Sequence, residues 1–333
     1  MTIPNNLHFN KYNKQLLPLI FLKFAFFFEK LYNLFMKKLK LIYNADSGKG
    51  SFKTHLDNVI KIFTKSGFDI SILRVEKIKQ VEKYLSQIEP DQYHTIVAAG
   101  GDGTLNVVVS CVVKYQLSAK IGILPAGTSN DFARSLSISK NFQQAAEIIA
   151  KGKTKKVDIG QITSSSKHKQ YFINVFGAGA VTNISHHVDP HLKNTIGNMA
   201  YYLKALEKLH DNTPLPVTIT NSSGTIQAEV YFFLIMNTGA AGGFDNFTPG
   251  AVIDDGYFDM MALKSGNIAD TLAPMLKFLK GEHLDDERVI YYRDNYTKLE
   301  FDIETETNID GEAGPQPPIE INLLPQAIEI YIP

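Results

Sequence analysis

The sequence has 333 residues, of which 44% are apolar and 20% charged, and such a chain can form two folded domains of ordinary size. Acidic and basic residues number 34 each, so no global electric field directs the protein to nucleic acid or to an anionic membrane. The single cysteine, Cys111, excludes a disulfide framework and a cysteine-built zinc site, and it fits a reducing cytoplasm.

Residues 1–37 form an N-terminal extension ahead of the first predicted strand. Its apolar stretch from Leu16 to Phe28 is shorter than the ~20 residues that span a bilayer, and no small-residue cleavage site follows it. Three interpretations stay open: an amphipathic helix on a membrane, a helix packed on the protein body, or sequence upstream of a true start at Met36. The chemistry argued below depends on none of them.

Short apolar strands alternate with amphipathic helices between residues 38 and 135. The pattern predicts strands over 38–44, 71–75, 95–101 and 121–127, and helices over 55–65, 76–88 and 104–114. Such alternation is typical of an open, mainly parallel sheet, which binds ligands beyond the carboxyl ends of its strands. We therefore expect an α/β domain with its ligand site at that edge.

The pattern becomes rich in β-strands after about Val157. Strands are predicted over 171–179, 216–222, 225–239, 257–265, 289–294, 296–303 and 318–324, interrupted by helical stretches over 198–210 and 269–281. The second half therefore predicts an antiparallel sandwich or barrel. The closing residues, about 326–333, are also strand-like, and they are a candidate to return to the first domain.

The strongest local motif is Gly100-Gly101-Asp102-Gly103-Thr104, which directly follows an apolar strand. Paired glycines let the backbone approach a phosphate and adopt positive φ. Thr104 can cap the next helix, whose N-terminus favours an anion, and Asp102 can hold Mg²⁺ or contact a transferring phosphoryl group. Taken alone, the motif is better explained as a tight turn with a capping threonine.

A second polar loop, Leu124–Arg134, also begins at the end of a strand. Thr128 and Asn130 supply a hydroxyl and an amide for phosphate, and Arg134 adds a fixed cation one turn into the helix. The alternative for Arg134 is a surface ion pair with Asp131.

A third loop, Asn44–Ser51, follows the first strand and contains Ser47 and Gly48. It is no P-loop, because Gly50 stands where GxxxxGK[ST] requires serine or threonine. Three polar, glycine-containing loops at three strand ends are hard to explain by turn chemistry alone. We expect them to converge on one polyphosphate.

The ordered motifs NxxSG, GGDGT, LPxGTxNDFAR, DDGxxD and DGE resemble the diacylglycerol kinase catalytic-domain family, specifically its soluble bacterial lipid kinases. In this sequence they are Asn44 with Ser47 and Gly48, Gly100–Thr104, Leu124–Arg134, Asp254–Asp259 and Asp310–Glu312. The resemblance runs from about Leu39 to the C-terminus. GGDGT alone also occurs in the related NAD and sphingosine kinases, whereas its pairing with GTSNDFAR is far more specific. Ala45 departs from the family, which usually has proline there.

The resemblance implies an α/β ATP-binding domain over 38–135 and a β-sandwich-like lipid-substrate domain over 136–325, with the active site between them. Together with the loop chemistry, it predicts that the nucleotide is bound by Asn44, Ser47, Gly48, Gly100, Gly101, Asp102, Gly103, Thr104, Thr128, Asn130 and Arg134.

The resemblance also implies two metal sites. Asp102 and Asp131 match carboxylates that are linked to the catalytic Mg²⁺ through water. Asp255 matches the carboxylate of a second, structural metal, which main-chain oxygens of Val252 and Tyr257 would complete.

Asp310 matches the family's general base, and Glu312 its acidic neighbour near the nucleotide and metal. The residues support this independently, since DGE follows a strand pattern and its glycine allows a sharp turn beside a ligand. Asp102 remains the rival for the role of base, with Asp310 then ligating metal.

The sequence therefore predicts a soluble cytoplasmic enzyme, peripheral at the inner membrane face, that transfers the γ-phosphoryl group of ATP to a lipid hydroxyl. Direct transfer is expected, because no His, Ser or Cys is placed as a covalent carrier. Diacylglycerol is the family-based choice of acceptor, and a homodimer is the family-based assembly. The alternatives are an NAD kinase of the same superfamily and a non-catalytic nucleotide- or lipid-binding regulator.

Overall fold

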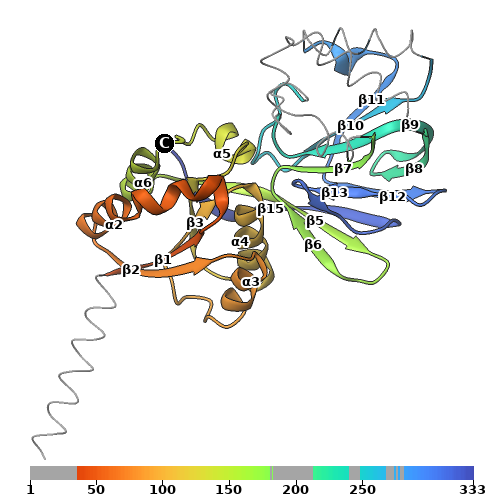
Figure 1. Cartoon of the computed structure of the whole chain (residues 1–333). Coiled ribbons are helices and arrows are strands. Elements are labelled where there is room, and N and C mark those ends of the chain that lie inside the picture. The colour runs from red at the N-terminus through yellow and green to blue at the C-terminus, as the bar shows by residue number, and fades with distance from the viewer. Residues whose placement is uncertain are drawn as a thin grey trace, which may run out of the picture.

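The computed structural model of the protein describes residues 36–180, 182, 213–239, 248–267, 274, 277 and 281–333 (Figure 1). The N-terminal extension up to residue 35, the predicted helix over 198–210 and most of that over 269–281 lie outside these residues. The described chain forms an α/β half and a β half, which strand β15 joins (Figure 1).

The α/β half begins with the first described strand and extends to residue 151. Its elements are β1 (Lys37–Asn44), the 3₁₀ helix η1 (Ser47–His55), α2 (Leu56–Lys65), β2 (Phe68–Val75), α3 (Lys79–Leu85), β3 (Thr95–Gly100), α4 (Asp102–Lys114), β4 (Lys120–Pro125), α5 (Asp131–Ser135) and α6 (Phe142–Lys151). All seven elements predicted for this half are present, with boundaries shifted by a few residues. Helix α6 was not predicted.

The sequence explains where helices of this half begin and pack. Val59 and Phe63 lie one turn apart on α2 and are both buried, as the spacing of its apolar residues requires. At the start of α6 the side chain of Asn141 accepts hydrogen bonds from the main-chain N–H groups of Gln143 and Gln144. Gly152 ends α6 in the left-handed conformation, with φ of 80°.

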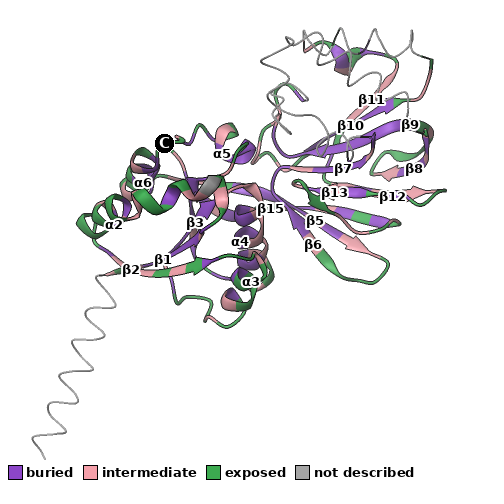
Figure 2. Cartoon of the chain, viewed as in Figure 1, coloured by how far each residue is buried: buried purple, intermediate pink, exposed green. Residues whose placement is uncertain are grey.

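The sheet of the α/β half has the order β2-β1-β3-β4, and each neighbouring pair is parallel. The carboxyl ends of β1, β3 and β4 therefore meet at one edge, and each is followed by one of the three polar loops. The predicted parallel sheet is confirmed, and its interior is apolar and buried (Figure 2).

The β half begins at residue 154. Its elements are β5 (Thr154–Ser164), β6 (Lys169–Phe172), β7 (Val175–Gly179), β8 (Leu215–Asn221), β9 (Gly224–Met236), β10 (Phe258–Lys264), the 3₁₀ helix η2 (His283–Asp285), β11 (Val289–Asp294), β12 (Tyr296–Phe301), β13 (Thr307–Ile309), β14 (Glu312–Ala313) and β15 (Ile319–Tyr331). The antiparallel pairs follow the order β15-β12-β8-β9-β7-β13-β14, and β10 pairs with β9. Phe172, Phe176, Phe233 and Phe258 fill the core of this sandwich-like half, whose predicted class is confirmed.

Strand β15 belongs to both halves. It pairs with β12 and β5 in the β half, and Ile330 near its end pairs in parallel with Ile121 of β4. The hydroxyl of Tyr331 lies 2.8 Å from Oγ1 of Thr95 on β3. The C-terminus is therefore anchored in the α/β sheet, beside β4, one of the strands that carry the polar loops.

Candidate active site

The three polar loops pack against one another at the carboxyl edge of the parallel sheet. A Cβ on Gly48 would overlap the carbonyl oxygen of Ala126, and a Cβ on Gly127 would lie 2.5 Å from Cα of Gly101. These contacts join the first loop to the second, and the second to the GGDGT motif. Only glycine allows main chains to approach so closely. The loops that were expected to converge therefore do lie together.

The first loop is also tied to the GGDGT motif by a hydrogen bond. Oγ of Ser47 accepts from the main-chain N–H of Gly101 at 3.3 Å. Oδ1 of Asn44 accepts from the N–H of Asp46 at 3.1 Å, so this amide shapes its own turn. Ala45 donates its main-chain N–H to the carbonyl of Val75 at 2.9 Å. A proline at this position, as in the family pattern, could not make that bond.

The GGDGT motif turns the chain from β3 into α4. Thr104 is buried, and a Cβ on Gly100 would lie 2.5 Å from Cβ of Thr104, so the threonine packs beneath the turn. Gly101 is the N-cap residue of α4, in an extended conformation. Asp102 and Gly103 therefore occupy the first turn of α4, where main-chain N–H groups face a ligand.

In the second loop Asn130 closes a small ring with Gly127. Oδ1 of Asn130 accepts from the N–H of Gly127 at 2.9 Å, and Nδ2 donates to the carbonyl of Gly127 at 2.7 Å. Asn130 has left-handed φ of 51° and is the N-cap residue of α5. Its amide thus holds the loop in shape, while Thr128 at the loop tip is exposed. Nucleotide contacts of either residue stay predictions.

Two carboxylates face each other between α4 and α5. Burial raises the pKa of Asp102, and the negative charge of Asp131 raises it further, against the opposing effect of main-chain N–H groups at the start of α5. Asp131 is buried and forms an ion pair with Arg134 at 2.9 Å. Asp131 is already balanced by Arg134, whereas Asp102 forms no ion pair within the described residues, so Asp102 is the carboxylate that fits the implied catalytic Mg²⁺.

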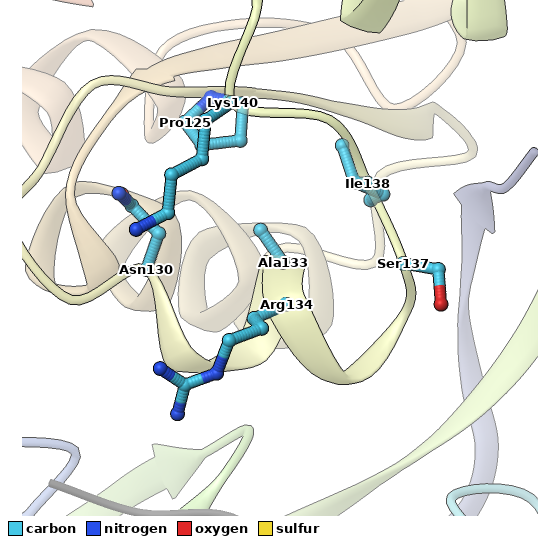
Figure 3. A pocket seen from close by; sticks show the side chains of 7 residues that line it. All are labelled: Pro125, Asn130, Ala133, Arg134, Ser137, Ile138 and Lys140. Atoms are coloured by element: carbon cyan, nitrogen blue, oxygen red, sulfur yellow. The ribbon is translucent and has the colours of Figure 1, made fainter. Parts of the chain in front are cut away.

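A hollow of ≈ 200 Å³ lies beside the second loop (Figure 3). Arg134 and Lys140 are among its lining residues, together with Asn130 and Pro125. Lys140 was not singled out in the sequence, because it follows α5 with no motif around it. Arg134 is ion-paired with Asp131, so Lys140 supplies the positive charge of this hollow that Asp131 does not balance.

Asp310 lies between β13 and β14 and has left-handed φ of 50°. Its Oδ1 accepts from the N–H groups of Asn174 and Val175, at 3.0 and 2.8 Å. Its Oδ2 accepts from the N–H of Ile173 at 2.8 Å and from Nδ2 of Asn106 at 2.6 Å. Burial raises the pKa of Asp310 to about 6, although all four donors favour the ionised form.

The carboxylates of Asp310 and Glu312 both lie next to residues of helix α4. Asp102 and Asn106 are four residues apart and share a face of the helix, so Asp310, bound to Asn106, lies one turn from Asp102. A Cβ on Gly103 would lie 3.4 Å from Oε1 of Glu312. The structure thus brings together three residues predicted as catalytic, and it adds Asn106, which sequence reasoning missed. Helical spacing from Asp102 was the signal that could have found it.

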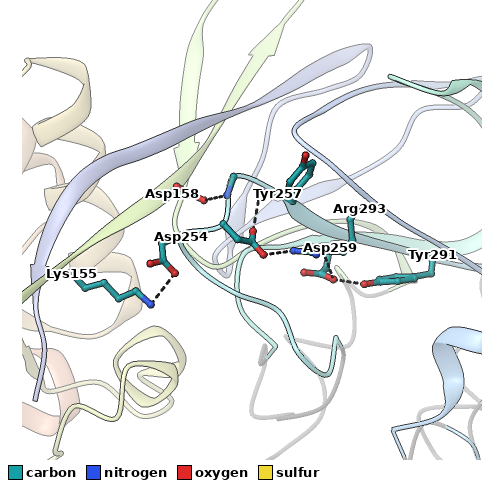
Figure 4. Close-up of polar contacts among 9 residues, drawn as sticks. Lys155, Asp158, Asp254, Tyr257, Asp259, Tyr291 and Arg293 are labelled. Atoms are coloured by element: carbon teal, nitrogen blue, oxygen red, sulfur yellow. Dashed lines mark hydrogen bonds and ion pairs between the residues drawn. The ribbon is translucent and has the colours of Figure 1, made fainter.

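The predicted second metal site shows a different arrangement (Figure 4). The carboxylate of Asp255 is ion-paired with Arg293, and its Oδ1 accepts from the N–H of Tyr257 at 3.1 Å. The guanidinium carbon of Arg293 lies 5.5 Å from the centre of the Tyr257 ring. Neighbouring Asp254 pairs with Lys155 at 2.9 Å. A divalent ion on Asp255 would lie beside a guanidinium cation, so these residues fit a second metal poorly, and that site stays a prediction.

Comparison with known proteins gives the family. The diacylglycerol kinase catalytic domain family matches residues 38–162. A diacylglycerol kinase from Bacillus subtilis (strain 168) is 34% identical over 299 residues, which are 90% of this chain and 97% of the relative. The chain belongs to the diacylglycerol kinase family. A diacylglycerol kinase from Staphylococcus carnosus (strain TM300) is also 34% identical, over 89% of this chain and 95% of that protein.

Membership of the diacylglycerol kinase family extends through the β half. The YegS C-terminal NAD kinase beta sandwich-like domain matches residues 174–332. A solved structure of a diacylglycerol kinase from Bacillus anthracis str. Sterne superposes with a TM-score of 0.72 at 25% identity, covering 89% of this chain and 97% of that one. The protein is thus a lipid kinase by family, as the motifs predicted. Within the described part of the chain, no helix has the length and apolarity needed to cross a bilayer.

Proposed function

We propose that the protein is an ATP- and Mg²⁺-dependent kinase that transfers the γ-phosphoryl group to the hydroxyl of diacylglycerol, giving phosphatidic acid. The observation that carries the proposal is the placement of Asp310 one turn of α4 away from Asp102, at the edge where three polar loops converge. In this proposal the α/β half, through α6, holds the nucleotide and the β half holds the lipid.

The polyphosphate of ATP would lie on the loops that follow β1, β3 and β4. Main-chain N–H groups at the start of α4 and the exposed hydroxyl of Thr128 face that edge, and Arg134 and Lys140 supply positive charge beside it. Asp102 and Asp131 would hold the catalytic Mg²⁺, which supplies charge neutralisation on the phosphates when bound. The carboxylate of Glu312, on β14, lies against Gly103 in the first turn of α4.

The chemical step is a direct, in-line transfer. The oxygen of the acceptor hydroxyl forms a bond with the γ-phosphorus, the bond from that phosphorus to the bridging oxygen breaks, and ADP leaves with the electron pair. The hydroxyl proton passes to the carboxylate of Asp310. A carboxyl group with a pKa of about 6 is suited to this role, because it is ionised at neutral pH yet basic enough to accept a proton late in the transfer.

Diacylglycerol is supported as acceptor by the names of the relatives alone, and a homodimer remains a family-based expectation. To collect such a lipid, the protein would contact the inner face of the membrane as a peripheral enzyme. The experiment is to incubate the protein with γ-labelled ATP, Mg²⁺ and mixed micelles that contain diacylglycerol, a sphingoid base or phosphatidylglycerol. Label is expected in phosphatidic acid with wild type and in no lipid with Asp310→Asn. Label in another lipid would correct the acceptor and keep the mechanism.

A further inference from the structure

The carboxylate of Asp310 has no unused acceptor site in this structure. A carboxylate offers about four lone-pair positions, two on each oxygen. Two N–H donors bind each oxygen of Asp310, at distances between 2.6 and 3.0 Å. A hydroxyl that is to give its proton to Asp310 must therefore displace one of the four donors.

Three of these donors belong to a stretch of main chain that is fixed on its other side. The carbonyls of Ile173 and Asn174 accept from Nδ2 and N of Asn237, each at 2.9 Å. The carbonyl of Val175 accepts from the N–H of Asp310 at 3.0 Å. The N–H groups of Asn174 and Val175 share their peptide units with the carbonyls of Ile173 and Asn174, so neither can turn away from Asp310 without breaking the bonds to Asn237 as well. The N–H of Ile173 directly follows strand β6, which pairs with β5 up to Phe172.

The fourth donor, Asn106, is the one that can move. It is a half-buried side chain whose torsion angles can change while the main chain of α4 stays in place. Its Nδ2 also donates to the carbonyl of Tyr171 at 3.1 Å, and its Oδ1 accepts from Oγ of Ser110 at 3.3 Å. When the bond to Asp310 opens, the carbonyl of Tyr171 and the hydroxyl of Ser110 remain within reach of the amide, so it is not left without hydrogen-bond partners.

We propose that Asn106 and Asp310 together form the docking point of the acceptor hydroxyl, which enters between Nδ2 of Asn106 and Oδ2 of Asp310. The hydroxyl donates a hydrogen bond to Oδ2 of Asp310 and accepts one from the N–H of Asn106 that has left Asp310. This inference rests on the proposed function and adds a residue to it. Asn106 then contacts the reacting oxygen and fixes its direction relative to the GGDGT motif, because Asn106 and the last three residues of that motif lie on α4.

The chemical balance is that of the transfer described above. The oxygen held by Asn106 forms the new bond to phosphorus, ADP leaves with the electron pair of the broken bond, and the proton remains on Oδ2 of Asp310. Once the hydroxyl has become a phosphate ester it has no proton to donate, and Asn106 can return to Asp310 after the proton is lost.

Two substitutions of Asn106 test this docking point. Asn106→Leu keeps the number and branching of the side-chain heavy atoms and removes the donor, so kcat/KM for diacylglycerol should fall by about 10- to 100-fold. The dissociation constant of Mg²⁺-ATP, measured by calorimetry without lipid, should stay within about twofold of wild type, since this side chain contacts no phosphate loop. Lys114→Gln, which removes a surface ion pair with Glu82 at the far end of α4, is the control on the same helix, and its lipid kinase activity should stay within about twofold.

Asn106→Asp separates docking from a merely structural role. Two facing carboxylates share a proton, and only the protonated Asp side chain restores a donor to the hydroxyl. The other site carboxylates, Asp102 on α4, Asp131 on α5 and Glu312 on β14, are the same in both proteins. The activity of Asn106→Asp relative to wild type should therefore rise as the pH is lowered from about 8 to about 6. This ratio is measured at saturating ATP, and it remains informative if Asn106→Leu fails to fold.

Two results would contradict docking at Asn106, and a third would contradict the proposed function itself. Asn106→Leu with kcat/KM for diacylglycerol within about twofold of wild type would contradict docking at Asn106. A constant ratio of Asn106→Asp to wild type across the pH range would do the same. A wild-type protein that phosphorylates no lipid would instead contradict the proposed function, and this inference with it.

Discussion

Gly127 and Gly101 meet main chain to main chain, because a Cβ on Gly127 would lie 2.5 Å from Cα of Gly101. This contact sets the distance between the second polar loop and the GGDGT motif. Gly127→Ala should force the loops apart and weaken Mg²⁺-ATP binding by at least about tenfold, since the donors to one polyphosphate would no longer be aligned. Calorimetry of nucleotide binding measures this.

The control for Gly127→Ala is Gly152→Ala at the end of α6. Gly152 has left-handed φ of 80° with no atom within 4 Å of an added Cβ, so the substitution costs about 1 kcal/mol of stability without touching the loops. Equal loss of nucleotide affinity in both variants would show that lowered stability, and not loop spacing, is the cause.

The pH dependence of turnover should report Asp310. Burial raises the pKa of this carboxyl to about 6, so the group is protonated, and lost as a base, as the pH falls through that value. We expect kcat at saturating substrates to drop about tenfold per pH unit below pH 6. An acidic limb near pH 4, where an ordinary aspartate titrates, would contradict Asp310 as the base.

Arg293 should make the second metal unnecessary for stability. Because its guanidinium already balances Asp255, the melting temperature of the nucleotide-free wild type should not respond to Mg²⁺ or EDTA. Arg293→Gln leaves Asp255 without this cation, and its melting temperature should become dependent on Mg²⁺. Lys298→Gln, which removes a cation from the surface pair with Glu300, is the matched control. A wild-type melting temperature that falls by several degrees on chelation would restore the predicted metal site.

Asp158 should stabilise the junction between β5, β15 and the loop before β10. The residue is fully buried, and its carboxylate accepts from the N–H groups of Gln326 and Gly256 at 2.7 and 2.8 Å. Asp158→Ala leaves both amides without this acceptor, so the free energy of unfolding should fall by about 3 kcal/mol. Urea denaturation measures the change. A loss below about 0.5 kcal/mol would show that water replaces the carboxylate fully.

Much of the fold could be predicted because the two halves differ in periodicity. Val59 and Phe63 mark the buried face of α2 by spacing alone, and the apolar runs of β1, β3 and β4 end directly at polar loops. Parallel pairing then places those loops at one edge without further information. Helix α6 was missed because it lies between the two predicted patterns, although Asn141 and Gly152 mark its ends.

The contacts of the candidate site could not be predicted to the same depth. Asn106 and Asp310 are 204 residues apart in sequence, and the amides of Ile173, Asn174 and Val175 belong to no motif. Such partners depend on how the two halves pack, which local periodicity does not encode. The same holds for Arg293, since nothing near it in the sequence indicates that it would reach Asp255.

The central claim is that this chain phosphorylates a lipid hydroxyl, and a parallel assay of two acceptors tests it most directly. Purified protein is given γ-labelled ATP and Mg²⁺, in one reaction with diacylglycerol micelles and in the other with NAD. We predict label in phosphatidic acid and none in NADP. Label in NADP with none in any lipid would contradict the lipid kinase assignment and support a nucleotide kinase instead.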